Sequence, residues 1–189
     1  MTSDSLAGLG RIIKKARRDP EAFSTLYDLF ARDIYRYCFS RAGNHADAED
    51  LTAQTFIAVM EGLSNYKEQG KFKAWLFSIA HNLSAGLQRK NKNHLPLEAV
   101  NLVDRGESPL GHVIQLEKVQ LASKLINELD PEEQELLRLR YLVDLSFTEI
   151  GHILGIPPGT AKKALYRLKD RLQTLAAIQG AKSGSRTDD

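Results

Sequence analysis

Apolar residues recur at every third or fourth position along most of this chain, and that spacing limits its fold more than any other feature of the sequence. It is the period of an amphipathic α-helix, whereas a half-buried strand alternates at every second residue. Alternating β-branched runs flanked by hairpin turns are missing from the sequence. The spacing therefore predicts an all-α fold.

Three helices are expected in the first half of the chain, over about 21–41, 46–63 and 72–90. The first carries one apolar stripe, formed by Phe23, Leu26, Tyr27, Phe30, Ile34, Tyr37 and Cys38. The second carries apolar side chains in more directions than a single buried stripe needs, so we expect part of its surface to serve a partner. The third has an apolar core face and an opposite polar face with aromatic edges.

In the second half, cap residues mark where helices begin and end. The run Asp130-Pro131-Glu132-Glu133 combines an Asp N-cap, Pro at the first helical position and Glu at the third. The run Ser146-Phe147-Thr148-Glu149 is a capping box that begins a short helix, which ends before Gly155. A last helix is expected to reach about Ala177, with Ala161, Leu165, Leu168 and Leu172 facing inward.

The 189 residues suffice for one ordinary domain or for two small helical ones. Residues 91–113 hold two prolines and two glycines without a sustained apolar period, which indicates a linker. The inferred boundaries are an N-terminal extension over 1–20, a helical domain over 21–92, a linker over 93–114, a second helical domain over 115–178 and a disordered tail over 179–189.

Composition narrows the class of protein. Hydrophobic residues make up 42% and charged residues 26%, a profile that excludes disordered, collagenous and fibrous chains. No run approaches the roughly 18 apolar residues that span a bilayer, and the first residues lack a secretory signal, so we expect a cytoplasmic protein with no membrane insertion. The single cysteine, Cys38, cannot form an internal disulfide, and its place in the apolar stripe favours a small core residue over a reactive thiol.

The formal net charge of +2 is distributed unevenly. Residues 121–158 hold three basic and seven acidic side chains, whereas residues 159–175 hold five basic side chains and one acidic side chain. A short capped helix, a turn with Gly155 and a longer helix with a basic outer face form the pattern of a helix-turn-helix, whose second helix enters the major groove of DNA. The candidate DNA-binding residues of that helix are Thr160, Lys162, Lys163, Tyr166 and Arg167. The alternative is an ordinary solvated helix face.

A second candidate surface interleaves aromatic rings with cations. Its residues are Tyr66, Lys67, Lys71, Phe72, Trp75, His81, Asn82, Arg89 and Lys90. Rings of this kind stack on unpaired bases, for about 1–3 kcal/mol each, while cations follow the backbone of a single strand. Taken singly, burial in the core is the favoured interpretation of Phe72 and Trp75, so the prediction depends on the cluster as a whole.

No constellation of residues points to catalysis. The carboxylates Asp47, Glu49 and Asp50 lie in the first turn of a predicted helix, where they complement the helix dipole. The five histidines show no paired ligand spacing, and a glycine-rich phosphate loop is missing from the sequence. We therefore expect a protein without a catalytic site, a metal or a cofactor.

Two motifs carry a family resemblance. The first is Asp47-Ala48-Glu49-Asp50-Leu51 with Thr55-Phe56, followed by the run from Phe72 to Leu83, FKAWLFSIAHNL. The second is LSFTEIG over 145–151 followed by LGIPPGTAK over 154–162. They resemble the two conserved domains of extracytoplasmic-function (group IV) sigma factors of RNA polymerase, and together the resemblance covers about 21–90 and 115–175.

The resemblance implies that the acidic helix docks on the clamp of core RNA polymerase through Asp47, Glu49, Asp50, Leu51, Gln54, Thr55 and Phe56. It also implies that the segment 66–82 captures a flipped base of the melted −10 element, that the recognition helix reads the −35 element, and that the linker threads the polymerase cleft. The implied partners are core RNA polymerase and promoter DNA, both duplex and melted, with an anti-sigma factor as a further candidate.

Four positions depart from the family pattern. Ala53 and Gln54 stand where Gln and Glu are usual, Gly86 where Asp is common, and Ala164 where Arg is common. Ala53 and Gln54 bear on the affinity for the polymerase clamp, and Ala164 bears on how the bases of the upstream −35 element are read.

Together these features predict a non-enzymatic sigma factor that gives RNA polymerase its promoter specificity and helps to open the duplex. A stand-alone helix-turn-helix regulator would account for residues 130–175, but it would leave the aromatic-basic loop and the clamp-like helix without a purpose. A helical protein-interaction adaptor is a third interpretation, in which the basic helix is a solvated face.

Overall fold

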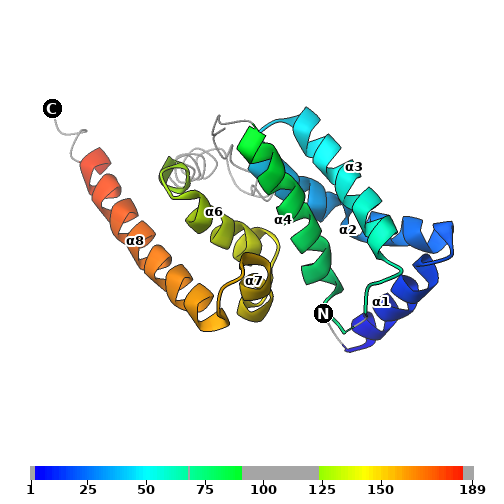
Figure 1. Cartoon of the computed structure of the whole chain (residues 1–189). Coiled ribbons are helices and arrows are strands. Elements are labelled where there is room, and N and C mark those ends of the chain that lie inside the picture. Colours follow the sequence, from blue (N-terminus) through cyan, green and yellow to red (C-terminus); the bar gives the residue numbers. More distant parts are fainter. Residues whose placement is uncertain (1–2, 68, 91–123, 185–189) are drawn as a thin grey trace, which may run out of the picture. The chain divides into compact units, whose positions relative to one another are not determined.

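The computed structural model describes residues 3–67, 69–90 and 124–184, with side chains over 8–67, 69–86 and 124–178. Every regular element in those ranges is helical, which confirms the all-α prediction. The chain divides into two compact units, Met1–Leu95 and Pro96–Asp189, which we call the N-terminal unit and the C-terminal unit and describe separately (Figure 1). The expected linker and the start of the second domain near residue 115 lie outside the described residues.

The N-terminal unit is a bundle of α1 (Ser3–Ala16), α2 (Pro20–Ala42), α3 (His45–Gly62) and α4 (Phe72–Lys90). Helix α2 packs against each of the other three (Figure 1). The predicted bounds of α2, α3 and α4 agree with the structure to within one residue. Helix α1 was not predicted, and it packs against α2 with Ile13 only 1% exposed.

Local capping explains where α2 and α3 begin. The Asp19 carboxylate accepts a hydrogen bond from the Glu21 amide at 3.0 Å, and Pro20 fills the first helical position. Helix α2 ends at Gly43, whose φ of 75° lets its amide donate to the Phe39 carbonyl. The next residue, Asn44, caps α3, so two residues reverse the chain between the helices.

The core of the N-terminal unit follows the predicted stripe of α2. Leu26, Phe30, Ile34 and Tyr37 are buried, but Tyr27 is 43% exposed because the helices around α2 cover only part of so broad a stripe. The Cys38 side chain is fully buried, and burial raises the pKa of its thiol to about 11. The thiol is therefore protonated at neutral pH and acts as a core residue, as the sequence predicted.

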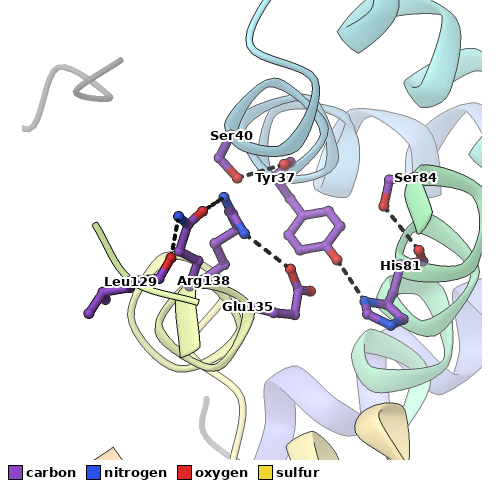
Figure 2. A network of polar contacts seen from close by, with 8 residues as sticks. Tyr37, Ser40, His81, Ser84, Leu129, Glu135 and Arg138 are labelled. Atoms are coloured by element: carbon purple, nitrogen blue, oxygen red, sulfur yellow. Dashed lines mark hydrogen bonds and ion pairs between the residues drawn. The ribbon is translucent and has the colours of Figure 1, made fainter. Parts of the chain in front are cut away.

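A buried polar contact joins α2 to α4. Tyr37 Oη and His81 Nδ1 lie 3.3 Å apart and share a hydrogen bond, and the Tyr37 ring meets Phe77 edge-on at 5.5 Å. Figure 2 also shows one hydroxyl bond within each helix: Ser40 Oγ donates to the Tyr37 carbonyl in α2, and Ser84 Oγ donates to the His81 carbonyl in α4. The contact fixes the two helices by directional bonds as well as by packing.

The C-terminal unit contains α6 (Pro131–Leu137), a π-helical turn η1 (Arg138–Leu142), α7 (Phe147–Leu154) and α8 (Pro158–Gly184). Both predicted capping boxes are present, Asp130 with Glu133 and Ser146 with Glu149. The inward residues predicted for α8 are confirmed at Ala161, Leu165 and Leu168, whereas Leu172 is half-buried. The π-helical turn was not predicted, and Tyr141 within it is 64% exposed.

Two charged residues of the C-terminal unit are buried. Glu135 and Arg138 are 3% and 8% exposed, and their side chains form an ion pair at 3.4 Å. Arg138 also donates to Gln134 Oε1 at 2.9 Å, and Gln134 Nε2 donates to the Leu129 carbonyl (Figure 2). Pairing and hydrogen bonding offset the cost of burying these charges.

Helix α8 is longer than predicted. It reaches Gly184 and not about Ala177, because residues 175–182, LAAIQGAK, are mostly good helix formers. Residues 179–184 of the expected disordered tail are therefore helical, and 185–189 lie outside the described range. No helix among the described residues is both long enough and apolar enough to span a bilayer.

The turn between α7 and α8 depends on close backbone approach at Gly151. Gly155 ends α7 with a φ of 67°, and the Ile156 amide donates to the Gly151 carbonyl at 3.0 Å. A Cβ added at Gly151 would lie 2.5 Å from the Ile156 carbonyl oxygen, which is a backbone atom that cannot swing away. Only glycine therefore fits at this position.

We expect Gly151→Ala to lower the free energy of unfolding by about 1–3 kcal/mol, as overpacking does in well-packed sites. Gly159→Ala is the matched control, because the same added methyl meets no atom within 4 Å. Thermal unfolding of the full chain, followed by circular dichroism, checks this. Equal melting temperatures for the two variants would contradict the packing described for the turn.

Candidate nucleic-acid interface

Helix α8 presents a basic row on its outer face. The side chains of Thr160, Lys162, Lys163, Tyr166 and Arg167 are all exposed. Ala161, Leu165 and Leu168 alternate with them and are buried, so the row is held outward by the core. The Lys162 ammonium lies 5.9 Å from the centre of the Tyr166 ring, close enough for a cation–π contact.

The cations of α8 fall into two groups: one binds a residue of its own unit, and the others face solvent. Arg171 forms an ion pair with Glu133 of α6 at 2.6 Å, which ties the helix to its own unit. No ion pair of Lys162, Lys163 or Arg167 occurs among the described residues. These three cations are therefore available to bind phosphate or the acceptors of guanine.

Four aromatic rings pack together where α3 leads through a loop into α4, and we call this group the aromatic cluster. The Tyr66 ring lies 4.7 Å from Trp75 and 5.5 Å from Phe72, and Phe72 lies 5.6 Å from both Trp75 and Phe30. Tyr66 and Phe72 are 9% and 2% exposed. They were expected to stack on unpaired bases, but in this structure they pack edge-on against each other at the two ends of the loop, while Trp75 is half-buried.

Between the buried rings of Tyr66 and Phe72, the described loop residues 67 and 69–71 are exposed. Lys67, Gln69 and Lys71 point their charged or amide groups to solvent, and Gly70 turns the chain with a φ of 70°. We call these exposed residues, Lys67 and 69–71, the lysine tip. The aromatic cluster thus fixes both ends of a short segment whose cations remain accessible.

The remaining predicted residues of this surface have different environments. His81 is half-buried and bonded to Tyr37, so part of its role is structural. Asn82, the next residue along α4, is exposed. The side chains of Arg89 and Lys90 lie outside the described set.

The predicted polymerase-facing residues of α3 separate into two groups. Glu49, Asp50 and Gln54 are exposed, Asp47 is half-buried, and Gln54 Nε2 donates to Asp50 Oδ2 at 2.7 Å. Asp47 accepts from Asn44 Nδ2 at 2.8 Å, so it also belongs to the cap of α3. Leu51, Thr55 and Phe56 are 3%, 0% and 6% exposed, so in this structure they are core residues of α3. Their contact with a partner stays a prediction.

An apolar hollow of about 520 Å³ lies between α2 and α3. Tyr27, Ile57 and Met60 line this hollow, and they are 43%, 53% and 58% exposed. Glu49 also lines it. None of these three apolar residues was named as a site residue. The available signal was the excess of apolar residues on α3, which led us to expect a partner surface on that helix.

No group of three or more histidine, cysteine, aspartate or glutamate side chains among the described residues could hold a metal ion. The exposed features described above are a basic row, a lysine tip and an apolar hollow with an acidic edge.

Two segments of the chain match known protein families. Residues 26–94 match Sigma-70 region 2, and residues 120–172 match Sigma-70 region 4. The chain is similar to the ECF RNA polymerase sigma factor ShbA of Streptomyces griseus, with 33% identity over 93% of this chain and 99% of the relative. It is 30% identical to SigW of Bacillus subtilis, over 86% of this chain and 93% of the relative.

Solved structures share the fold. CnrH, solved in complex with the cytosolic domain of CnrY, superposes with a TM-score of 0.64 at 20% identity, over 88% of this chain and 96% of that chain. RpoE of Bartonella quintana, solved with the anti-sigma factor NepR, also gives a TM-score of 0.64, at 23% identity over 82% and 97% of the two chains.

Proposed function

The chain belongs to the extracytoplasmic-function sigma factors of RNA polymerase, and we propose that its two units act on different forms of promoter DNA. As a member of this family, it directs promoter-specific initiation of transcription by core RNA polymerase. The stand-alone regulator is not favoured, because the region 2 match spans the unit that such a regulator would not need.

We assign duplex recognition to the basic row of α8. The row is rigid, since buried residues alternate with Thr160, Lys162, Lys163, Tyr166 and Arg167 along one helix. A rigid helix with outward cations suits the major groove, where phosphates fix its register and base edges give specificity. This row would read the −35 element.

We assign strand opening to the lysine tip with the half-buried Trp75 beside it. Flipping a base out of the stack costs a few kcal/mol, which contacts with the extruded strand must offset. Lys67 and Lys71 can follow the backbone of that strand, and Trp75 offers the one ring of the aromatic cluster that is not buried. Asn82, exposed on α4, is retained as a candidate contact to the same strand.

We assign polymerase binding to the apolar hollow and the acidic edge of α3. Exposed apolar residues that form a contiguous patch commonly mark a protein interface, and Glu49, Asp50 and Gln54 add a polar rim. An anti-sigma factor is a second candidate partner, as in RpoE of Bartonella quintana, which was solved with NepR. Competition for one surface would let such a factor block the polymerase.

We further propose that the protein is not itself an enzyme and that it works in the cytoplasm, where it meets polymerase and chromosome. The observation that carries the whole assignment is the pairing of two separate cationic surfaces, one on a rigid helix and one on an anchored loop, within a chain that matches both sigma regions.

Removing two cations from each surface should separate the two steps. Lys162→Ala with Lys163→Ala should weaken closed-complex formation and lower the slope of log affinity against log salt by about 2. Lys67→Ala with Lys71→Ala should spare that affinity and slow strand opening about tenfold, because the extruded strand loses its backbone contacts. Filter binding measures the first step, and permanganate reactivity of unpaired thymines measures the second.

Each double variant is the control for the other, since both remove two exposed lysines. The division proposed here is wrong if the loop variant opens promoters at the normal rate. It is equally wrong if that variant loses closed-complex affinity as the helix variant does.

Reversing one charge on α3 tests the polymerase surface. Asp50→Lys should weaken binding to core polymerase about tenfold, or about 1.4 kcal/mol, and leave helicity intact because Asp50 is exposed. Leu51 is left unchanged, since it is buried and its truncation would also unfold α3. Pull-down with core enzyme measures the affinity, and Asp170→Lys on α8 is the control for the change in charge. Equal affinity for both folded variants would remove α3 from the interface.

A further inference from the structure

A long-range hydrogen bond joins the end of α1 to the start of the loop before α4. A guanidinium nitrogen of Arg17 donates to the Tyr66 carbonyl oxygen at 2.5 Å, across 49 positions of sequence. Arg17 directly follows α1, and residue 26 is where the region 2 match begins. The bond therefore connects the loop to a part of the chain that precedes the matched segment.

The amide and the ring of Tyr66 are held as well. Its amide donates to the Gly62 carbonyl at 3.1 Å, which continues the last turn of α3. Its ring packs on Phe72 and Trp75 in the aromatic cluster. Its carbonyl lies in the loop that follows α3, and Arg17 supplies the donor.

The backbone on either side of Arg17 is held in place by packing and by hydrogen bonds. Ile13 and Ala16 of α1 are buried against the bundle, at 1% and 8% exposed. The amides of Arg18 and Asp19 both donate to the Lys15 carbonyl at 3.1 Å, which closes the turn between α1 and α2. A cation attached to this turn can hold the loop in one place although its own side chain is largely exposed.

We propose that Arg17 is a positioning residue for strand opening: it fixes the peptide between Tyr66 and Lys67 and so sets the direction in which the lysine tip leaves the bundle. This inference rests on the opening role proposed for the tip. A tip that is already ordered loses less conformational entropy when it grips a strand, so it binds the extruded strand more tightly.

The contact can be followed by the fluorescence of Trp75, the only tryptophan of the chain, whose ring lies 4.7 Å from Tyr66. Arg17→Ala in the full chain should increase the quenching of Trp75 by acrylamide and slow promoter opening about three- to tenfold, as expected for one lost hydrogen bond. Arg17→Lys, which keeps the charge and a donor, should recover part of both effects. Circular dichroism verifies that each variant is folded.

Arg18→Ala is the matched control, because it removes the same charge from the next exposed position. It should leave the quenching and the opening rate unchanged. Unchanged quenching in Arg17→Ala overturns the positioning role, and if opening still slows with a lower salt slope, Arg17 is a phosphate contact instead. Increased quenching with normal opening would show that the loop is not the opening element, which contradicts the function proposed for the tip and not the contact itself.

Discussion

The packing of Tyr66, Phe72 and Trp75 on one another, with Phe30 of α2 beneath Phe72, is the interaction on which the N-terminal unit depends. It joins the end of α3, both ends of the following loop and the first turn of α4. Aromatic rings bury a large area and prefer tilted or edge-on geometries, so they define one arrangement of these segments. With both loop ends fixed, the intervening lysines can only project outward. The packed rings thus hold the ends of the segment that carries Lys67 and Lys71, the exposed cations that we assign to the melted strand.

In the C-terminal unit, backbone contacts determine where α8 begins. The close approach of α7 to the following turn at Gly151, and the left-handed cap at Gly155, set where α8 begins. Buried Ala161, Leu165 and Leu168 then fix its rotation, so Lys162, Lys163 and Arg167 face outward. A duplex has a regular groove that a rigid helix can fit, whereas an extruded strand is irregular and suits a loop. This contrast supports the proposed assignment of the two surfaces to the two forms of promoter DNA.

Local signals in the sequence predicted the elements well, and tertiary burial was harder to predict. Caps such as Ser146 with Glu149 act within one turn, so their residues identify helix ends directly. Whether Leu51, Thr55 or Phe72 faces a partner or the core depends on which neighbouring helix covers it, and periodicity does not encode that. The Arg17 bond to Tyr66 spans 49 positions and has no local signature. Helix α1 has 14 residues, and it was missed because residues 1–20 were assigned as an extension.

Site-specific photocrosslinking in complexes of the full chain with core polymerase and promoter DNA tests the central claim most directly. A photoreactive residue would replace exposed Lys67 in one variant and exposed Lys162 in another. The account predicts that position 67 crosslinks to the melted −10 strand, and only once the promoter has opened. Position 162 should crosslink to the −35 duplex both before and after opening. Crosslinks from position 67 to the upstream duplex, or from position 162 to the melted strand, would contradict the separation of roles between the two units.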